Sequence, residues 1–322
     1  MSTVMEPPSG LAYYQVQRSG RSGWGRPLIG LILIGLCVFF VSPAVVLAAF
    51  EVFFVLAGDD VSNGMVRVAD VENVTPESLA FLLLSLAGAI PAAMLLCWAL
   101  HGLRPGWLAS VERRIRWRWL LQCLGIAAIT MVVTVVIASR LPIPGEDLGA
   151  STLNPWTSTM RDFVLVIVLL TPLQAAGEEY LFRGYIFQTF GSLFGGMLGA
   201  RTVSVTITAL LFAFAHGSQD LPLFLDRFAF GIVAGICVIA TGGIEAGIAM
   251  HVLNNFVSLG MAVAFGDIST VLNTSEGSWW RIPVTLVQSG VFLALTVWAA
   301  RSAGLSTTTK SPGSGPAGVP IS

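Results

Sequence analysis

Residues 163–184 read FVLVIVLLTPLQAAGEEYLFRG, and two features of this stretch set the architecture of the chain. Its first half is an unbroken apolar run of the kind that lies in lipid. Its second half places two adjacent carboxylates and a guanidinium, at Glu178, Glu179 and Arg183, in the same helical stretch. A charge at hydrocarbon depth costs a few kcal/mol or more. These three residues are therefore candidates for function.

The whole chain is almost as apolar as this stretch. Of its 322 residues, 55% are hydrophobic and only 11% are charged, and the mean hydropathy is +0.79. A soluble domain carries roughly a quarter charged residues, so the composition excludes a soluble protein of this size. The net charge of −1 gives no reason to expect a nucleic-acid partner. The four cysteines stand singly, without metal-binding or disulfide spacing.

Eight apolar runs approach or exceed the roughly 20 residues that a membrane-spanning helix needs. They cover residues 27–50, 79–101, 119–139, 162–190, 202–217, 221–240, 244–266 and 282–302. Because the runs are continuously apolar, without the alternation of a barrel strand, they predict helices. We expect an all-α, polytopic membrane bundle of about eight transmembrane helices at 27–302, between an N-terminal tail (1–26) and a disordered tail (303–322).

The arginines predict how this bundle sits in the bilayer. They gather in the N-terminal tail, between the second and third runs, and at Arg201. These are alternate connections, and the positive-inside rule makes all of them cytoplasmic. Both termini are then cytoplasmic, in a multi-pass protein of the cell membrane. The preference for arginine over lysine, with many alanines and glycines, is typical of a GC-rich bacterial gene and indicates a bacterial plasma membrane.

Two further runs carry polar side chains at helical spacing. The fifth run ends with Phe212 and His216, and the seventh contains His251 and Asn255. Residues four apart share one face of a helix. The pairs with this spacing are Glu179 with Arg183, Phe212 with His216, and His251 with Asn255. Glu178 points about 100° away from Glu179, so one carboxylate can be structural and the other chemical.

These residue types suit the hydrolysis of an amide inside the membrane. Glu178 can act as general base and, with His216, activate a water molecule. His251 and Asn255 can donate hydrogen bonds to the oxygen of a tetrahedral intermediate. The sequence contains no G-x-S-x-G and no cysteine beside a histidine motif, which disfavours a covalent mechanism.

The sequence leaves a metal open. Glu178, His216 and His251 are the ligand types of catalytic zinc, although the H-E-x-x-H spacing is absent. A divalent ion, zinc first, is therefore a candidate cofactor. The other intramembrane candidates lie near the ends of runs, where they are expected to reach the interface. They are Glu51, His101, Asp226, Arg227 and Glu245.

The three motifs, Glu-Glu-x-x-x-Arg, Phe-x-x-x-His and His-x-x-x-Asn, occur in this order in successive apolar runs. In this they resemble the CPBP family of intramembrane endopeptidases, which includes the type II CAAX prenyl endopeptidases and the abortive-infection and bacteriocin-processing proteins. The resemblance covers residues 160–260. It implies an eight-helix membrane bundle and a membrane-anchored protein or peptide substrate.

The resemblance also implies roles for individual residues. Glu178 with His216 would activate water, and His251 with Asn255 would form the oxyanion site. The supporting residues would be Glu179, Arg183 and Phe212. Both a metalloprotease mechanism and a metal-free mechanism are compatible with the resemblance.

Two alternatives remain open at this point. The chain could be a non-catalytic immunity or scaffold protein of the membrane that retains the motifs. It could also be a proton-coupled transporter, because buried glutamates and histidines serve as proton sites. A transporter needs polar residues that continue toward the other face, and the sequence offers few besides Asp226 and Arg227.

Overall fold

The computed structural model describes residues 4–21, 23, 25–138, 140, 152–194 and 196–310. Within these ranges the secondary structure is helical, with isolated bridges and no strand. Seven helical stretches are long and apolar enough to cross a membrane. The prediction of an all-α, polytopic membrane bundle is confirmed.

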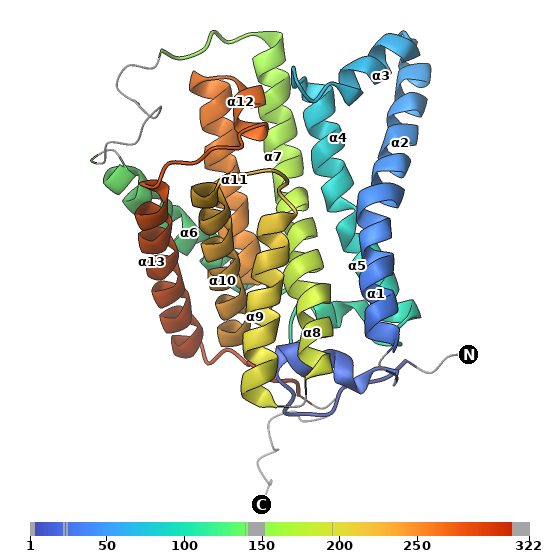
Figure 1. Ribbon diagram of the computed structural model, residues 1–322, viewed down its shortest axis with the longest axis vertical. Helices are drawn as coiled ribbons and strands as arrows, with labels where there is room; N and C mark the ends of the chain where they lie inside the picture. Colours follow the sequence, from blue (N-terminus) through green and yellow to red (C-terminus); the bar gives the residue numbers. More distant parts are fainter. Residues whose placement is uncertain are drawn as a thin grey trace, which may run out of the picture.

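The seven stretches correspond to seven of the predicted runs and are numbered as in Figure 1. They are α1 and α2 (Gly25–Leu36 and Ser42–Ala57), α4 and α5 (Pro76–Ala87 and Ala89–Ala99), α6 (Trp117–Ala138), α7 and α8 (Ser158–Glu179 and Phe187–Leu193), α10 (Leu221–Thr241), α11 (Glu245–Phe265) and α13 (Arg281–Ser302). A π-helical segment, Cys37–Val41, joins α1 to α2, and another, Tyr180–Ile186, joins α7 to α8.

The remaining predicted run is the shorter helix α9, Met197–Phe214. It begins five residues before the predicted run 202–217 and ends before His216. Its upper end lies below the upper ends of α7 and α11 (Figure 1). His216 is thus carried at the end of a helix that stops inside the height of the bundle.

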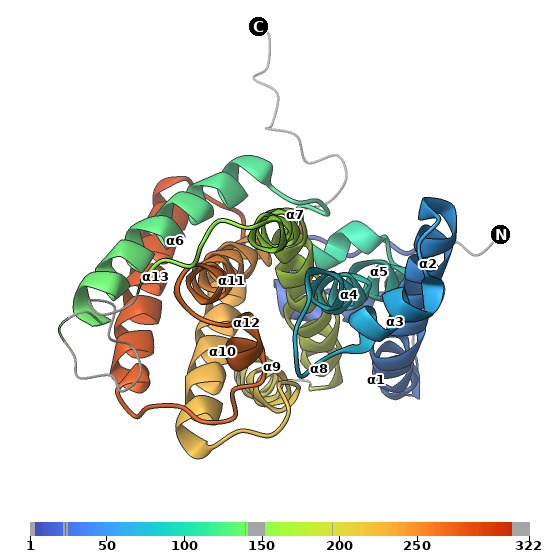
Figure 2. The same cartoon turned by 90° about the horizontal axis from the view of Figure 1, so that it is seen from above.

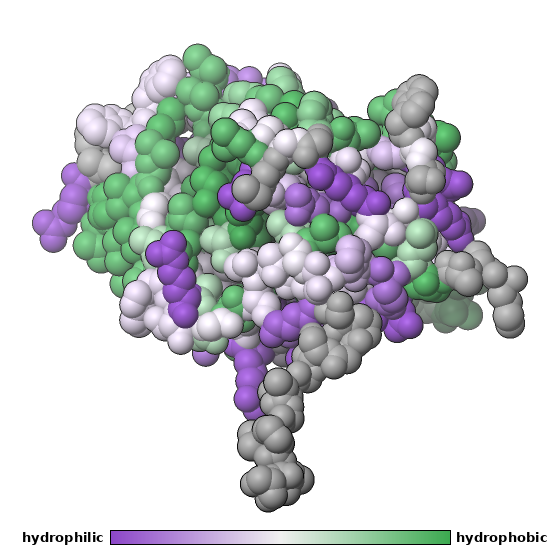
Figure 3. Space-filling model, turned by 90° about the horizontal axis from the view of Figure 1, so that it is seen from below, coloured by the Kyte–Doolittle hydropathy of each residue, from purple (hydrophilic) through white to green (hydrophobic). Residues whose placement is uncertain are grey.

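Short elements close the two ends of the bundle (Figure 1). At one end lie α3 (Val61–Ala69) and α12 (Ile268–Leu272), and the amide of Val74, in the loop after α3, donates to Ser269 Oγ of α12 at 3.0 Å. At the other end lie two 3₁₀ turns, Tyr13–Ser19 and Pro105–Leu108. Seen from this second end, hydrophilic side chains spread over the face and apolar ones lie along part of its margin (Figure 3).

The two ends of the described chain meet at this second end. The Gly10 amide donates to the Thr309 carbonyl, and the Thr309 amide donates to the Leu11 carbonyl, both at 2.9 Å. Thr309 is only 2% exposed. The prediction of a disordered tail from residue 303 is therefore wrong for residues 303–310, because backbone pairing with the N-terminal segment orders them. Residues 311–322 lie outside the described residues.

Small residues let the central helices approach closely. Seen from above, α7 and α11 lie between α1 to α5 on one side and α6 and α13 on the other (Figure 2). A Cβ at Gly177 of α7 would come within 2.4 Å of the Leu86 carbonyl of α4. One at Gly231 of α10 would come within 2.8 Å of Ala209 of α9. Helices in membranes associate through such close backbone contacts, and these hold the polar segment of α7 inside the bundle.

Candidate active site

A cluster of polar side chains lies where α7 passes into the π-helical segment Tyr180–Ile186. Glu178 is 8% exposed, and Glu179 and Arg183 are fully buried. Single π-helical turns inside longer helices occur frequently at functional sites. The segment that carries the first sequence motif is therefore both buried and locally irregular.

Glu179 and Arg183 form the ion pair that their spacing predicts. Arg183 Nη1 lies 2.8 Å from Glu179 Oε1. The guanidinium also stacks on the ring of Phe212, with 4.5 Å from its central carbon to the ring centroid. A buried charge is tolerated when it is paired, and here each charge has its counter-charge, although Glu179 Oε2 and Arg183 Nε have no hydrogen-bond partner among the described residues.

His251 lies between the two glutamates. Its Nδ1 is 3.1 Å from Glu179 Oε1, and its Nε2 is 3.7 Å from Glu178 Oε2. Because the carboxylate of Glu179 can only accept a hydrogen bond, Nδ1 carries the proton of this contact, and Nε2 faces Glu178. A carboxylate that fixes the tautomer and orientation of a histidine in this way is a recurring support in active sites.

The other side of Glu178 is held by a residue that the sequence motifs do not include. Gln174, one turn earlier on α7, donates from Nε2 to Glu178 Oε1 at 2.7 Å. Asn255 of α11 donates from Nδ2 to Gln174 Oε1 at 2.8 Å. Gln174 therefore links the first and third motifs. Its spacing of four from Glu178 was the one signal in the sequence that could have identified it.

One oxygen of the Glu178 carboxylate makes no hydrogen bond within the described part of the chain. Oε2 is buried and has no hydrogen-bond partner among the residues that the structure describes. It is the oxygen that faces His251 Nε2. When Glu178 is ionised and His251 carries its proton on Nδ1 alone, Glu178 Oε2 and His251 Nε2 are both acceptors, and a ligand that donates two hydrogen bonds satisfies both.

Phe212 separates His216 from the rest of the cluster. The Phe212 ring centroid lies 4.7 Å from that of His216 and 5.7 Å from that of His251. His216 donates from Nδ1 to the Phe212 carbonyl at 2.7 Å. Its side chain is exposed and makes no hydrogen bond to Glu178 within the described ranges. Hydrogen bonds and ion pairs thus join Glu178, Glu179, Arg183, His251 and Asn255 through Gln174, whereas His216 lies at the rim, in contact with Phe212 and near enough to Glu178 for their charges to interact.

Two residues expected at the interface are buried instead. Glu245 is fully buried and pairs with Arg116, with Arg116 Nε at 2.8 Å from Oε1 and Nη2 at 2.7 Å from Oε2. His101 is 2% exposed, and its Nε2 lies 2.8 Å from the Tyr185 hydroxyl. Both lie near helix ends, as expected, but each is buried against a partner from a distant part of the chain.

The remaining three intramembrane candidates lie nearer the surface. Glu51 is exposed on α2, as expected. Asp226 and Arg227 are partly buried: the Thr285 hydroxyl donates to Asp226, and Arg227 Nη1 donates to Gln219 Oε1 at 2.7 Å. None of the three joins the cluster around Glu178 by a hydrogen bond in the described part of the chain.

The side chains of the cluster do not match the ligand set of a catalytic zinc. Across the described residues, no group of three or more His, Cys, Asp and Glu side chains is arranged to hold an ion. A catalytic zinc takes three protein ligands, and here Glu178 and His251 supply two, with His216 apart at the rim. The residues do not fit such a site, and no step proposed below uses a metal.

The cluster coincides with the part of the chain that known proteins share. Residues 160–257 match the sequence model of a family described as type II CAAX prenyl endopeptidase Rce1-like. This range begins in α7 and ends just after Asn255, so it contains every residue of the three motifs. The resemblance inferred from those motifs is confirmed.

Three curated bacterial proteins are similar to the chain. They are uncharacterized protein YyaK of Bacillus subtilis (26% identical, covering 45% of this chain and 54% of that protein), an uncharacterized 24.3 kDa protein of Escherichia coli (25%, covering 45% and 66%) and the membrane-embedded CAAX protease MroQ of Staphylococcus aureus (28%, covering 40% and 52%). The chain thus spans about half to two thirds of the length of these relatives. No solved structure matches it.

Proposed function

We propose that this chain, with its Rce1-like segment at residues 160–257, is an intramembrane peptidase that hydrolyses a peptide bond of a membrane-associated protein or peptide. The observation that carries the proposal is the pair Glu178 Oε2 and His251 Nε2, which face each other at 3.7 Å inside the bundle. One relative of the chain is named a CAAX protease, which supports the same class of reaction.

In this proposal a water molecule lies to one side of these two acceptors and bridges them. A water molecule has two O–H donors, so it can donate one hydrogen bond to Glu178 and one to His251. Both bases then draw electron density toward the water oxygen. Gln174 fixes the orientation of Glu178 through its other oxygen, and Glu179 fixes that of His251. The nucleophile is thereby positioned before the substrate arrives.

The reaction follows from this placement. As the water oxygen attacks the carbonyl carbon, Glu178 accepts one of its protons, and the carbonyl oxygen becomes an oxyanion. Asn255 has a second amide hydrogen, besides the one given to Gln174, with which to stabilise that oxyanion. When the C–N bond breaks, Glu178 returns the proton to the leaving amine. The products are a carboxylate terminus and a new amine terminus.

In this proposal the roles of the two histidines differ from those inferred from the sequence. The imidazole beside Glu178 is that of His251, so His251 rather than His216 shares the water in this proposal. His216 lies exposed beside Phe212 at the end of α9. It marks the rim across which a substrate backbone reaches the water.

The orientation belongs to the same proposal. Arg18, Arg21, Arg104, Arg113 and Arg201 contact the segments at the end of the bundle where residues 4–12 and 303–310 meet. By the positive-inside rule this end is cytoplasmic. Lys310 is the single lysine of the chain, so a membrane-impermeant amine reagent should modify it in inverted vesicles and leave it unmodified in intact cells.

The decisive experiment compares wild type with Glu178→Gln in nanodiscs on a panel of membrane-anchored peptides. The variant keeps the size of the side chain and removes the base. We expect wild type to cleave at least one peptide and Glu178→Gln to lose at least about 1,000-fold in rate. Glu51→Gln, the same substitution at an exposed position of α2, is the matched control and should cleave normally.

The Glu178→Gln variant, together with two further assays, separates the alternative functions. A folded Glu178→Gln protein with full activity would rule out the proposed base. The double variant His216→Ala with His251→Ala lacks both imidazoles. If it protects cells as well as wild type does, the chain has an immunity or scaffold role. Proton-coupled uptake that depends on Glu178, without cleavage of any peptide, would indicate a transporter.

A further inference from the structure

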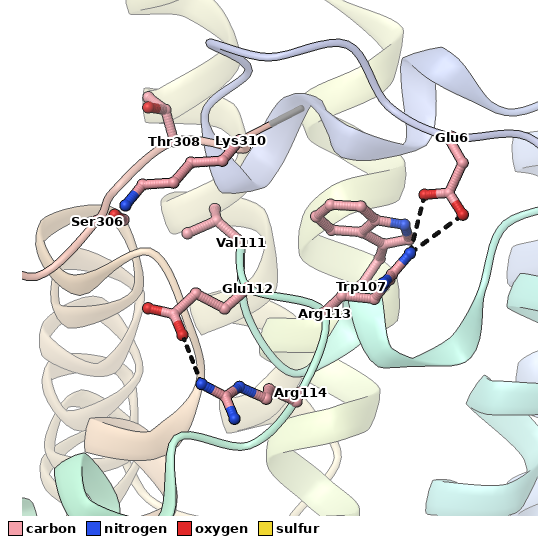
Figure 4. A pocket seen from close by; sticks show the side chains of 9 residues that line it. All are labelled: Glu6, Trp107, Val111, Glu112, Arg113, Arg114, Ser306, Thr308 and Lys310. Atoms are coloured by element: carbon pink, nitrogen blue, oxygen red, sulfur yellow. Dashed lines mark hydrogen bonds and ion pairs between the residues drawn. The ribbon is translucent and has the colours of Figure 1, made fainter. Parts of the chain in front are cut away.

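A polar cavity lies at the end of the bundle where the two described ends of the chain meet. It has a volume of about 340 Å³ and is separate from the cluster around Glu178. We call it the basal pocket. Its walls come from the connection between α5 and α6, from Glu6, and from the segment that follows α13 (Figure 4). Cavities of about 300 Å³ and more are of the size that holds small ligands.

One wall is an extended segment that presents three donors. The bridge between Ala12 and Thr308 shows that this segment is extended, and side chains two apart on an extended chain share a side. Ser306, Thr308 and Lys310 line the pocket, and the ammonium group of Lys310 lies beside Ser306 (Figure 4). Lys310 has no ion-pair partner among the residues described.

The opposite wall carries two arginines on a tight turn. Arg113 has a φ of 62°, the only positive value for a residue other than glycine in the described chain, and its guanidinium is paired with Glu6. Arg114 lies 3.4 Å from Glu112 and is largely exposed. Three cationic and two acidic side chains line the pocket, which leaves a net charge of +1.

Neighbouring contacts place the pocket at the depth of lipid head groups. The Ser306 carbonyl is 3.5 Å from Arg116 Nη1, and the same nitrogen binds the carbonyl of Thr241, the last residue of α10, at 2.8 Å. Arg116 directly precedes Trp117, which begins α6 and is 69% exposed. Exposed tryptophans at the ends of spans mark the interface between hydrocarbon and head groups.

We propose that the basal pocket binds the head group of an anionic phospholipid. The phosphate would accept hydrogen bonds from Ser306, Thr308 and Lys310, and the carboxylate of Glu112 would accept a hydrogen bond from a head-group hydroxyl, as in phosphatidylglycerol. Basic pockets at the ends of transmembrane helices are typical sites for such lipids. The acidic side chain favours a lipid with hydroxyl donors over a bare phosphate ion. This inference does not depend on the proposed peptidase activity.

The single lysine makes the test direct. Purified protein is placed in nanodiscs of phosphatidylcholine alone, or with a fifth of phosphatidylglycerol, and Lys310 is modified with an amine-reactive ester and quantified by peptide mass spectrometry. We expect phosphatidylglycerol to slow the modification about fivefold, as an ion pair of about 1 kcal/mol would. Phosphatidylcholine with added inorganic phosphate should give no protection.

Two variants complete the test. Arg301→Lys adds a second amine at an exposed position of the same end, and that amine should be protected less than about twofold, as a general surface potential would do. Ser306→Ala with Thr308→Val removes two donors without changing charge and should reduce the protection of Lys310 to the same low level.

Three results would overturn the proposal. They are equal modification in the two lipid mixtures, equal protection of the reference lysine at position 301, and full protection by inorganic phosphate alone. The last result would indicate a free anion as the ligand.

Discussion

The carboxylate of Glu179 lies directly against the backbone of Gly247, where α11 packs on α7. A Cβ at Gly247 would come within 2.4 Å of Glu179 Oε2. Oε1 of the same carboxylate holds both Arg183 and His251. The absence of a side chain at position 247 is therefore what allows one buried carboxylate to support an imidazole on a different helix.

Gly247→Ala should disable the site without a polar residue being changed. The new methyl group would push Glu179 away from α11, and a displacement of about 1 Å in an active site costs about 100-fold in rate. We expect a loss of cleavage of that order together with a lower melting temperature. Gly260→Ala is the control on the same helix, because a Cβ there meets nothing within 4 Å. Equal activity of the two variants would contradict the assigned role of Glu179.

Gln174→Leu should slow cleavage by about 10- to 100-fold, the usual cost of losing a residue that orients a catalytic group. The substitution keeps the size of a side chain that is 4% exposed and removes its hydrogen bonds to Glu178 and Asn255. Gln122→Leu, on the exposed side of α6, should leave the rate unchanged. Rates of peptide cleavage in nanodiscs check both. A Gln174→Leu enzyme as fast as wild type would show that Glu178 needs no such support.

The Arg116–Glu245 pair gives a prediction about stability. Removing one member of a buried ion pair leaves an uncompensated charge and costs about 3–5 kcal/mol, whereas replacing both with apolar residues is often close to neutral. Glu245→Leu should therefore lower the melting temperature in detergent strongly. Arg116→Met combined with Glu245→Leu should recover most of the loss. If the double variant melted lower than the single one, the backbone contacts of Arg116 would matter more than its charge.

The buried imidazole of His101 should make the folded protein less stable in mild acid. Burial lowers the pKa of His101 to about 4, and the charge of Arg26 lowers it in the same direction. The unfolded chain, with a histidine pKa of about 6.5, binds more protons between these values, so stability falls as the pH drops from about 6.5 toward 4. The cost between pH 7 and pH 5 is about 2 kcal/mol.

His101→Gln tests this dependence, because glutamine can keep a hydrogen bond to Tyr185 and does not titrate. Melting temperatures of wild type and variant at pH 7 and pH 5 are the measurement. The drop should be markedly smaller in His101→Gln. Equal drops in the two proteins would assign the acid sensitivity to other groups.

Chelation should leave cleavage intact. The cluster offers Glu178 and His251 as ligands, and the described residues supply no third that would complete a zinc site. Activity that survives treatment with 1,10-phenanthroline and EDTA is the expected result. Loss of activity on chelation, with recovery on addition of zinc, would show that His216 moves inward to join the other two residues around a metal.

The sequence predicted those parts of the site that depend on helical spacing. Glu179 with Arg183, and Phe212 with His216, lie four residues apart, and each pair stays in contact although Arg183 lies in the π-helical segment and His216 just beyond the end of α9. The scarcity of charge in the apolar runs also predicted that the motifs of different helices would meet, because isolated charges are not tolerated there. His251 between two glutamates follows that expectation.

Relationships between distant segments could not be predicted from one sequence. Arg116 and Glu245 are 129 residues apart, and nothing in either local pattern refers to the other. The same holds for His101 and Tyr185, which are 84 residues apart. Gln174 was not among the predicted site residues, and its link to Asn255 is made by tertiary packing.

The pairing of Gly10 and Leu11 with Thr309 has a consequence for biosynthesis. Ribosomes deliver the chain from its amino end, so residues 8–12 wait without their backbone partners until the whole set of membrane crossings has been threaded. The pairing of Gly10 and Leu11 with Thr309 can therefore form only after all the spans have been synthesised. A chain that stalls or is cut before residue 308 keeps an unpaired segment at its amino end. A quality-control protease could bind that segment.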